Sequence, residues 1–212
     1  AVLDIRLNSL KNSVDCFVIV ESKFYHNGKK RDLKFDISKY PKFKDKIIYI
    51  VQDEEPTDLE ILKKDDDEGT KSYKFIFNAH KRENFQRNLI SKGLDKSNED
   101  DLIMISDVDE IPNLKDLNVA KVNNNIVIFE QNIFYYKLNR YLEGFTWHGT
   151  KACKKKNLKS PQWIRNVKNK KFNFWRLDTF FSETKYINKI FIKSGGWHFS
   201  NLKNPADIEN KL

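Results

Sequence analysis

Residues 101–112 have the sequence Asp101-Leu102-Ile103-Met104-Ile105-Ser106-Asp107-Val108-Asp109-Glu110-Ile111-Pro112, in which an apolar run ends in three acids within four residues. A short apolar run bounded by polar residues is typical of a core strand that is covered on both faces. In open α/β sheets, ligands bind beyond the carboxyl ends of the strands, which is where these acids fall. The stretch therefore predicts an α/β fold with a functional site after this strand.

The acids also form an Asp-x-Asp motif, Asp107 and Asp109. In an extended segment the two side chains project to the same side, so both carboxylates can bind one hard divalent cation together with the oxygens of a substrate diphosphate. Acidic surface turns contain the same motif by chance. At this point a metal site and a solvated turn both remain open.

Length and charge limit the alternatives. The chain has 212 residues with 39% hydrophobic residues and only seven glycines and five prolines, which indicates one folded domain. Its net charge of +9 suits an anionic partner such as a nucleotide, a nucleic acid or a membrane surface. The lysines are spread along the chain, with one cluster at residues 151–159, so a solvated face explains most of them equally well.

The two cysteines, Cys16 and Cys153, indicate no disulfide framework, and Cys16 is predicted to be a small core residue of the apolar run 16–20. No run of residues is long enough to cross a bilayer, and the first residues do not resemble a signal peptide. We expect a cytoplasmic protein without a transmembrane segment.

Other periodic segments place the remaining elements. We predict a helix in the first residues, strands at 15–21 and 46–52, an acidic solvated loop at 53–69, and one long strand or two bent strands at 125–138. A helix over residues 72–93 is predicted to have Ser72 as its N-cap, to end at Gly93, and to bury His80.

A second informative segment is Ser194-Gly195-Gly196-Trp197-His198-Phe199-Ser200. Its glycines permit a tight turn or a close approach of the backbone. A lone histidine is usually not a metal ligand. Here, however, an Asp-x-Asp motif upstream needs a further donor, and neutral imidazole binds manganese-type cations well. We therefore predict a metal site made of Asp107, Asp109 and His198.

Taken together, several motifs resemble those of glycosyltransferase family 17 in order and spacing. They are Leu3-Asp4-Ile5-Arg6-Leu7, Val18-Ile19-Val20-Glu21-Ser22, Arg82-Glu83-Asn84-Phe85-Gln86-Arg87, Asp107-Val108-Asp109-Glu110-Ile111-Pro112 and Gly195-Gly196-Trp197-His198-Phe199-Ser200. The best-known members of this family are the β-1,4-mannosyl-glycoprotein 4-β-N-acetylglucosaminyltransferases. The resemblance implies a GT-A nucleotide-sugar fold with a mixed sheet flanked by helices, an inverting mechanism, UDP-GlcNAc as donor, and a divalent cation, Mn²⁺ or Mg²⁺.

The resemblance also suggests roles for single residues. The predicted donor-binding residues are Arg6, Glu21, Arg82, Glu83, Arg87, Asp107 and Trp197. Glu83 and Arg87 are one helical turn apart, so a simple surface pair is an equal alternative for them. Glu110 is the predicted general base that takes the proton of the acceptor hydroxyl. As alternative bases, we do not exclude Glu130, Glu143, Asp178 and Glu183.

Two features separate the chain from the family pattern. The family usually has a strand ahead of the Leu-x-Ile-Arg-Leu segment, so we expect residues 1–212 to form a single GT-A-like domain that lacks its first strand. Residues 151–193 match no motif, and the glycan or glycoconjugate acceptor stays open. Two rivals remain: a metal-dependent phosphoesterase or nuclease, and a non-catalytic nucleic-acid-binding module, whose affinity would fall steeply with salt. Under the glycosyltransferase hypothesis, we expect no nucleic-acid partner.

Overall fold

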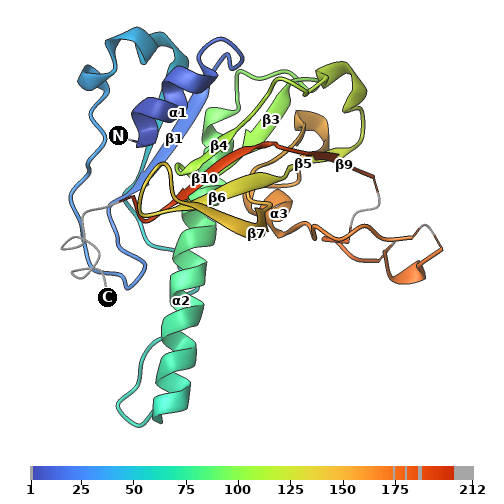
Figure 1. Ribbon diagram of the computed structural model, residues 1–212. Coiled ribbons are helices and arrows are strands. Elements are labelled where there is room, and N and C mark those ends of the chain that lie inside the picture. The colour runs from blue at the N-terminus through green and yellow to red at the C-terminus, as the bar shows by residue number, and fades with distance from the viewer. Residues whose placement is uncertain (1, 174, 180, 186–187, 203–212) are drawn as a thin grey trace. The chain divides into compact units, whose positions relative to one another are not determined.

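The structure is a computed structural model, and it describes residues 2–173, 175–179, 181–185 and 188–202 (Figure 1). The chain forms two compact units. Unit one contains Ala1–Val14, Ser97–Lys159 and Trp163–Leu212, and unit two contains Asp15–Lys96 and Ser160–Gln162. Both units combine helical segments with strands, so the predicted mixed α/β class is confirmed.

The strands of unit two form a parallel pair. β1 (Phe17–Ser22) lies beside β2 (Ile47–Gln52), with Phe17 opposite Ile47 and Ser22 opposite Gln52. Parallel neighbours need a long crossover, and here residues 23–46 supply it, including the short helices η1 (Ile37–Lys39) and η2 (Pro41–Lys46). Both predicted strands are therefore confirmed. Cys16 is exposed, so its predicted place in the core is wrong, because the strand begins only at Phe17.

The long helix of unit two is α2 (Glu68–Asn88), which continues as η3 (Leu89–Gly93). Its N-cap is Asp67, whose carboxylate accepts a hydrogen bond of 2.6 Å from the Thr70 N–H, so the prediction of Ser72 as N-cap is wrong. The end at Gly93 is confirmed. A Cβ at Gly93 would lie 2.6 Å from Val18 Cγ1, so the glycine lets η3 pack closely on β1.

The exposed face of α2 explains a further error. Tyr73, Ile76 and His80 are spaced three and four residues apart and share one helical face, and all of them are exposed. The His80 side chain is 69% exposed, so the prediction of a core histidine is wrong. The prediction of a solvated acidic loop is only partly confirmed, because the Asp66 side chain is just 9% exposed and its carboxylate lies 2.8 Å from Lys74 Nζ.

Unit one contains two sheets. In the first, β3 (Leu102–Ile105) is antiparallel to β8 (Lys151–Lys154), β8 is antiparallel to β5 (Ile126–Phe129), and β5 is parallel to β9 (Lys189–Ile192). The predicted strand before the acids is thus confirmed as β3. The core of this sheet is apolar and comprises Val122, Val127, Phe129, Ala152 and Ile192.

The second sheet of unit one has the order β4-β10-β6-β7 (Figure 1). Its strands are β4 (Glu110–Pro112), β10 (Gly196–Ser200), β6 (Gln131–Tyr135) and β7 (Tyr141–Trp147). The predicted element at 125–138 is therefore two strands, β5 and β6, and they belong to different sheets. At Gly196, φ is +122° and a Cβ would lie 2.1 Å from the Ile111 carbonyl oxygen, so this position requires glycine.

Two α-helices complete the description. α1 (Val2–Leu10) is the predicted first helix and buries Leu7 and Leu10, and α3 spans Pro161–Asn166. The other short helices are η4 (Val119–Lys121), η5 (Lys155–Asn157) and η6 (Leu177–Thr179). Among the described residues, no helix combines the length and the apolar character needed to span a membrane.

Candidate active site

The acids after β3 lie on a tight turn. The Glu110 N–H donates to the Asp107 carbonyl oxygen at 3.1 Å, so the chain reverses within these residues and then starts β4. The expectation of an extended segment is therefore wrong, and the two carboxylates lie against different side chains of the site. Asp107 Oδ2 lies 2.8 Å from Arg165 Nη2, whereas Asp109 Oδ2 lies 3.7 Å from His198 Nε2.

Glu110 has the most enclosed carboxylate of the turn, with no exposed surface. The groups that donate to its oxygens are Arg165 Nη1 at 2.8 and 3.0 Å, Trp147 Nε1 at 2.7 Å, Thr150 Oγ1 at 3.2 Å and the Asp107 N–H at 3.0 Å. A buried carboxylate requires such partners, because an unpaired charge in the interior is costly. In this arrangement Glu110 holds the turn together, and its oxygens are not open to a substrate.

Arg165, on α3, joins the first and last acids of the turn. One guanidinium nitrogen contacts Glu110 and the other contacts Asp107, in the planar forked geometry that suits carboxylates. Arg165 Nη1 also donates to the Gly149 carbonyl oxygen. A Cβ at Gly149 would lie 1.7 Å from Glu110 Oε1, so only glycine leaves room for this arrangement. We call Asp107, Glu110 and Arg165 the acid clamp.

Arg6, on α1, fixes the other side of the turn. Its guanidinium donates to the carbonyl oxygens of Glu110 and Asp107, the latter at 3.3 Å, and to Ser106 Oγ at 2.5 Å. Burial lowers the pKa of Arg6, and the charges of Glu110, Asp107 and Asp109 oppose this shift. The donors of Arg6 are thus directed at the backbone of the turn, and its predicted contact with a donor substrate stays a prediction.

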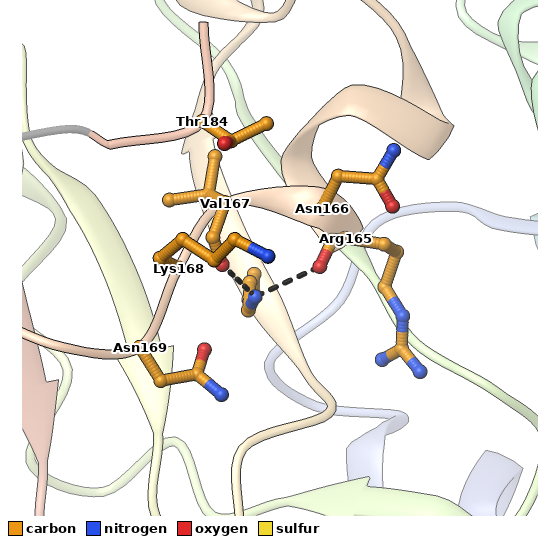
Figure 2. Close-up of a pocket in the computed structure, with 7 residues that line it drawn as sticks. Arg165, Asn166, Val167, Lys168, Asn169 and Thr184 are labelled. Atoms are coloured by element: carbon orange, nitrogen blue, oxygen red, sulfur yellow. Dashed lines mark hydrogen bonds between the residues drawn. The ribbon is translucent and has the colours of Figure 1, made fainter. Parts of the chain in front are cut away.

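Lys151, on β8, contacts the backbone at the end of α3, where Arg165 lies. Its ammonium group donates to the carbonyl oxygens of Arg165, at 2.9 Å, and of Val167, at 2.5 Å, beside a pocket of about 500 Å³ (Figure 2). Figure 2 shows the Arg165 side chain extending away from the side chains of Lys168 and Asn169. Burial, followed by the nearby charges of Arg165 and Lys189, lowers the pKa of Lys151 to about 8. Its assignment to a solvated lysine cluster is wrong, because it belongs to the core strand β8.

Asp109 and His198 form a second pair, next to the clamp. The two residues come from the turn and from β10, and the Phe199 N–H donates to the Asp109 carbonyl oxygen at 2.9 Å. The Asp109 side chain is 36% exposed. His198 packs against the indole ring of Trp147, with ring centroids 4.5 Å apart and planes 10° apart. Its Nδ1 is buried and has no hydrogen-bond partner among the described residues.

The predicted metal ligands can be compared with this geometry. In the part of the chain that the structure describes, no group of three or more His, Cys, Asp or Glu side chains is arranged to hold a metal ion. Asp107 is paired with Arg165, whereas Asp109 and His198 offer an oxygen and a nitrogen 3.7 Å apart. This pair fits a cation that takes its remaining ligands from a substrate and from water.

Trp197 and His198 are neighbours in β10, so their side chains point to opposite faces of the sheet. His198 lies directly opposite Glu110 in the antiparallel ladder, and residues in that position share a face. Trp197 therefore lies on the face away from the Asp109–His198 pair. Its predicted contact with the donor remains untested, and it would have to be made from that other face.

The other predicted donor-binding residues belong to unit two, and Glu21 is tightly held there. Burial raises its pKa, but hydrogen bonds from the N–H groups of Lys34 and Phe35 and from the Tyr49 hydroxyl outweigh this effect, so the pKa is lowered overall. The three bonds measure 2.8, 3.0 and 2.9 Å. Glu21 thus fixes residues 34–35 against β1 and β2.

Arg82, Glu83 and Arg87 are also paired within unit two. Arg82 Nε donates to Glu55 Oε1 at 2.5 Å, and Glu83 Oε1 accepts from Arg87 Nη2 at 2.7 Å. The surface-pair alternative for Glu83 and Arg87 is therefore present in the structure. A role of these residues in donor binding stays a prediction.

Sequence reasoning missed Arg165 and Lys151. Arg165 lies in the stretch 151–193, which matched no motif, and it meets Asp107 only through the fold. The sequence holds a weak signal for Lys151, because this lysine directly precedes the small apolar pair Ala152-Cys153. In the structure all three residues are buried. A lysine at the start of a small apolar run is compatible with a strand that enters the core.

Comparison with known proteins and protein families identifies the family of this chain. Neither the curated proteins nor the solved structures yield a match to this chain. The model of Glycosyltransferase family 17 matches residues 1–207, which include the acid clamp, the Asp109–His198 pair and all other described elements. A match over nearly the whole chain is far more specific than any single motif. The chain therefore belongs to glycosyltransferase family 17 and is a glycosyltransferase.

Proposed function

We propose that this glycosyltransferase transfers GlcNAc from UDP-GlcNAc to a hydroxyl group of a glycan, with inversion at the anomeric carbon, and that residues 1–212 act as one GT-A-like domain. The proposal rests first on the family, and within the structure on one observation. Asp109 and His198 lie 3.7 Å apart beside the acid clamp, and the Asp109 carboxylate is partly exposed. This is the pair that a diphosphate-bound cation would need.

In this proposal, Asp109 and His198 hold a divalent cation, Mn²⁺ or Mg²⁺. Such a cation supplies positive charge that stabilises a diphosphate leaving group. Asp107 is held by Arg165 and keeps 43% of its side chain exposed. The burial of His198 Nδ1 leaves Nε2 as the imidazole nitrogen that faces Asp109.

In the transfer step, an acceptor hydroxyl oxygen attacks the anomeric carbon, the bond to the UDP oxygen breaks with its electron pair leaving on UDP, and a base takes the hydroxyl proton. Glu110 was the base expected from the sequence. Because its carboxylate is fully buried and accepts from Arg165 and Trp147, we propose instead that Glu110 is a positioning residue.

The remaining candidate bases differ in their surroundings. The ion pairs of Asp178 with Arg176 and Lys185 lower its pKa to about 2, which makes it a weak base. Glu130 is partly exposed and lies 3.9 Å from His148 Nε2. Glu183 is well exposed and lies 3.7 Å from Lys159 Nζ. We therefore place Glu130, Glu143 and Glu183 ahead of Asp178 as bases to be tested by substitution with glutamine.

The test of the proposed function is incubation of the protein with a panel of UDP-sugars and Mn²⁺, with UDP release as the readout. We expect release from UDP-GlcNAc above all other donors, and the loss of this release when EDTA removes the cation. In parallel, Mn²⁺ binding is measured directly from the electron paramagnetic resonance of the free ion in the presence of UDP. Asp109→Asn and His198→Ala should each weaken Mn²⁺ binding by at least about tenfold.

Asp100→Asn is the matched control, because Asp100 is an exposed aspartate of unit one that pairs with Lys154 and Lys156. It should leave Mn²⁺ binding unchanged. Equal Mn²⁺ binding by the wild-type protein and Asp109→Asn would refute the assignment of the metal pair. Preferential use of another UDP-sugar would instead refute the choice of donor and leave the metal pair standing.

A further inference from the structure

Strand β7 is an unusually exposed edge of the site-bearing sheet. Among the described strands it pairs with β6 alone, in the order β4-β10-β6-β7, and nearly all of its residues are exposed. Phe145 is 62% exposed and Trp147 is 37% exposed. Large aromatic side chains on an exposed strand expose apolar surface to water at a free-energy cost, so they commonly mark a binding surface.

The ladder register shows which face these rings occupy. Trp147 lies opposite Gln131, and His198 lies opposite Ile133, two residues further along β6. Residues two apart on a strand share a face, so Trp147 and His198 project to the same side, in agreement with their stacked rings. Alternation along the extended residues 145–147 places Phe145 on that side as well, and the ladder with β6 shifts its register beyond Thr146.

Three further aromatic residues of this sheet, Phe134, Tyr141 and Phe199, lie on the opposite face. Phe134 and Phe199 have ring centroids 5.5 Å apart, and the Tyr141 ring lies 5.5 Å from Phe134. These rings pack against one another and form an aromatic cluster of their own. Phe145 has no ring contact among the described residues, which leaves its ring face open.

Trp147 connects this exposed face with the candidate active site. Its indole N–H donates to Glu110 of the acid clamp at 2.7 Å, and one face of its ring covers His198. The exposed ring of Phe145 therefore lies on the same face as His198, two residues along β7 from Trp147. A molecule stacked on Phe145 would lie on the face that carries His198 of the proposed metal pair.

We propose that Phe145 and Trp147 form the acceptor platform, a surface on which a pyranoside ring of the acceptor glycan stacks. The proposal rests on the proposed function and names the place of its second substrate. A pyranose presents a face of C–H groups that packs on an aromatic ring, while its hydroxyl groups remain at the rim for hydrogen bonds. Phe145 provides the open ring, and Trp147 contacts both Glu110 and His198.

The experiment compares donor hydrolysis with sugar transfer in the same protein. The acceptor probes are the methyl β-glycosides of mannose, glucose, galactose and GlcNAc, each offered with UDP-GlcNAc and Mn²⁺. Phe145→Ala should raise the KM for the best of these probes by about tenfold, a change that corresponds to about 1.4 kcal/mol. The KM for UDP-GlcNAc and the rate of donor hydrolysis without acceptor should stay within about twofold. Phe145→Tyr keeps the ring and should restore the acceptor KM.

Tyr141→Ala is the control, because it removes an aromatic ring from the same strand but from the opposite face. It should leave the acceptor KM unchanged. An equal rise in the acceptor KM for Tyr141→Ala and Phe145→Ala, an unchanged acceptor KM in Phe145→Ala, or a rise in the donor KM alone would each overturn the platform. So would a wild-type protein that hydrolyses UDP-GlcNAc but transfers to none of the four probes. Failure to hydrolyse UDP-GlcNAc at all would instead refute the proposed function.

Discussion

Replacing Arg165 by methionine tests whether the acid clamp stabilises the fold. The substitution keeps an unbranched side chain of similar length but removes the guanidinium that contacts Glu110 at 2.8 and 3.0 Å. Glu110 would then be a fully buried carboxylate whose hydrogen-bond donors are all neutral, and Arg6 would be the remaining positive charge near it. Removing one partner of a buried ion pair costs about 3–5 kcal/mol. The pair with the half-exposed Asp107 adds only about 0–1 kcal/mol.

Trp147 and Thr150 would still donate to Glu110, so we expect the lower part of the range, about 3 kcal/mol. The measurement is urea unfolding followed by circular dichroism. With a slope of about 2 kcal/mol per molar urea, the midpoint should fall by roughly 1.5 M. Arg176→Met is the matched control, because it removes an arginine from the exposed pair with Asp178, and it should cost less than about 1 kcal/mol.

A double substitution isolates the interaction itself. In a Glu110→Gln background there is no buried charge to compensate, so Arg165→Met should cost at least about 1.5 kcal/mol less than it does in the wild-type protein. An equal cost in both backgrounds would show that Arg165 stabilises the protein through other contacts. A cost below about 1 kcal/mol in the wild-type background would refute the reasoning about the buried carboxylate.

Three further predictions follow from single features. The folded-state pKa of Lys151 is about 8, against 10.5 for an ordinary lysine, so the unfolded state binds more protons between these values and stability rises with pH. The stability of the wild-type protein relative to Lys151→Met, measured by urea unfolding, should therefore increase from about pH 8 to pH 10. A constant difference between the two proteins would contradict the assignment. Gly149→Ala should destabilise the protein by about 1–3 kcal/mol or more, because the new Cβ would overlap Glu110 Oε1, whereas Gly69→Ala meets no atom closer than 3.4 Å and should change the midpoint of thermal unfolding little. Cys153 is buried and burial raises its pKa to about 12, so iodoacetamide should label only the exposed Cys16 in the native protein and both thiols in urea, as mass spectrometry would show; rapid native labelling of Cys153 would count against its burial.

The sequence predicted the elements that depend on local pattern. The strands at 17–22, 47–52 and 102–105 and the helix end at Gly93 follow from apolar runs and from a glycine stop, and all of them are present. The sequence analysis connected Asp107, Asp109 and His198 through a shared cation; the structure places Asp109 3.7 Å from His198, and the cation stays a proposal.

The failures have physical causes that no local pattern contains. Alternation along a strand predicted that Asp107 and Asp109 face one partner, but the hydrogen bond from the Glu110 N–H to the Asp107 carbonyl forms a turn that separates them. Arg165 is 58 positions from Asp107 and 55 from Glu110, so only the fold brings these residues together. The burial of Glu110 depends on Trp147 and Arg165, which no spacing near the turn indicates, and this burial is the reason for the positioning role that we propose.

The position of β10 has a consequence for the folding of the protein during its synthesis on the ribosome. β10 comes late in the chain, yet it lies in the interior of its sheet, between β4 and β6. A nascent chain that has emerged only as far as β7 therefore has β4 and β6 made but not bridged, with sheet edges open to other chains. It also has Asp109 without His198. Under the proposed assignment of the metal pair, the protein can therefore bind the cation only after β10 has been inserted between β4 and β6.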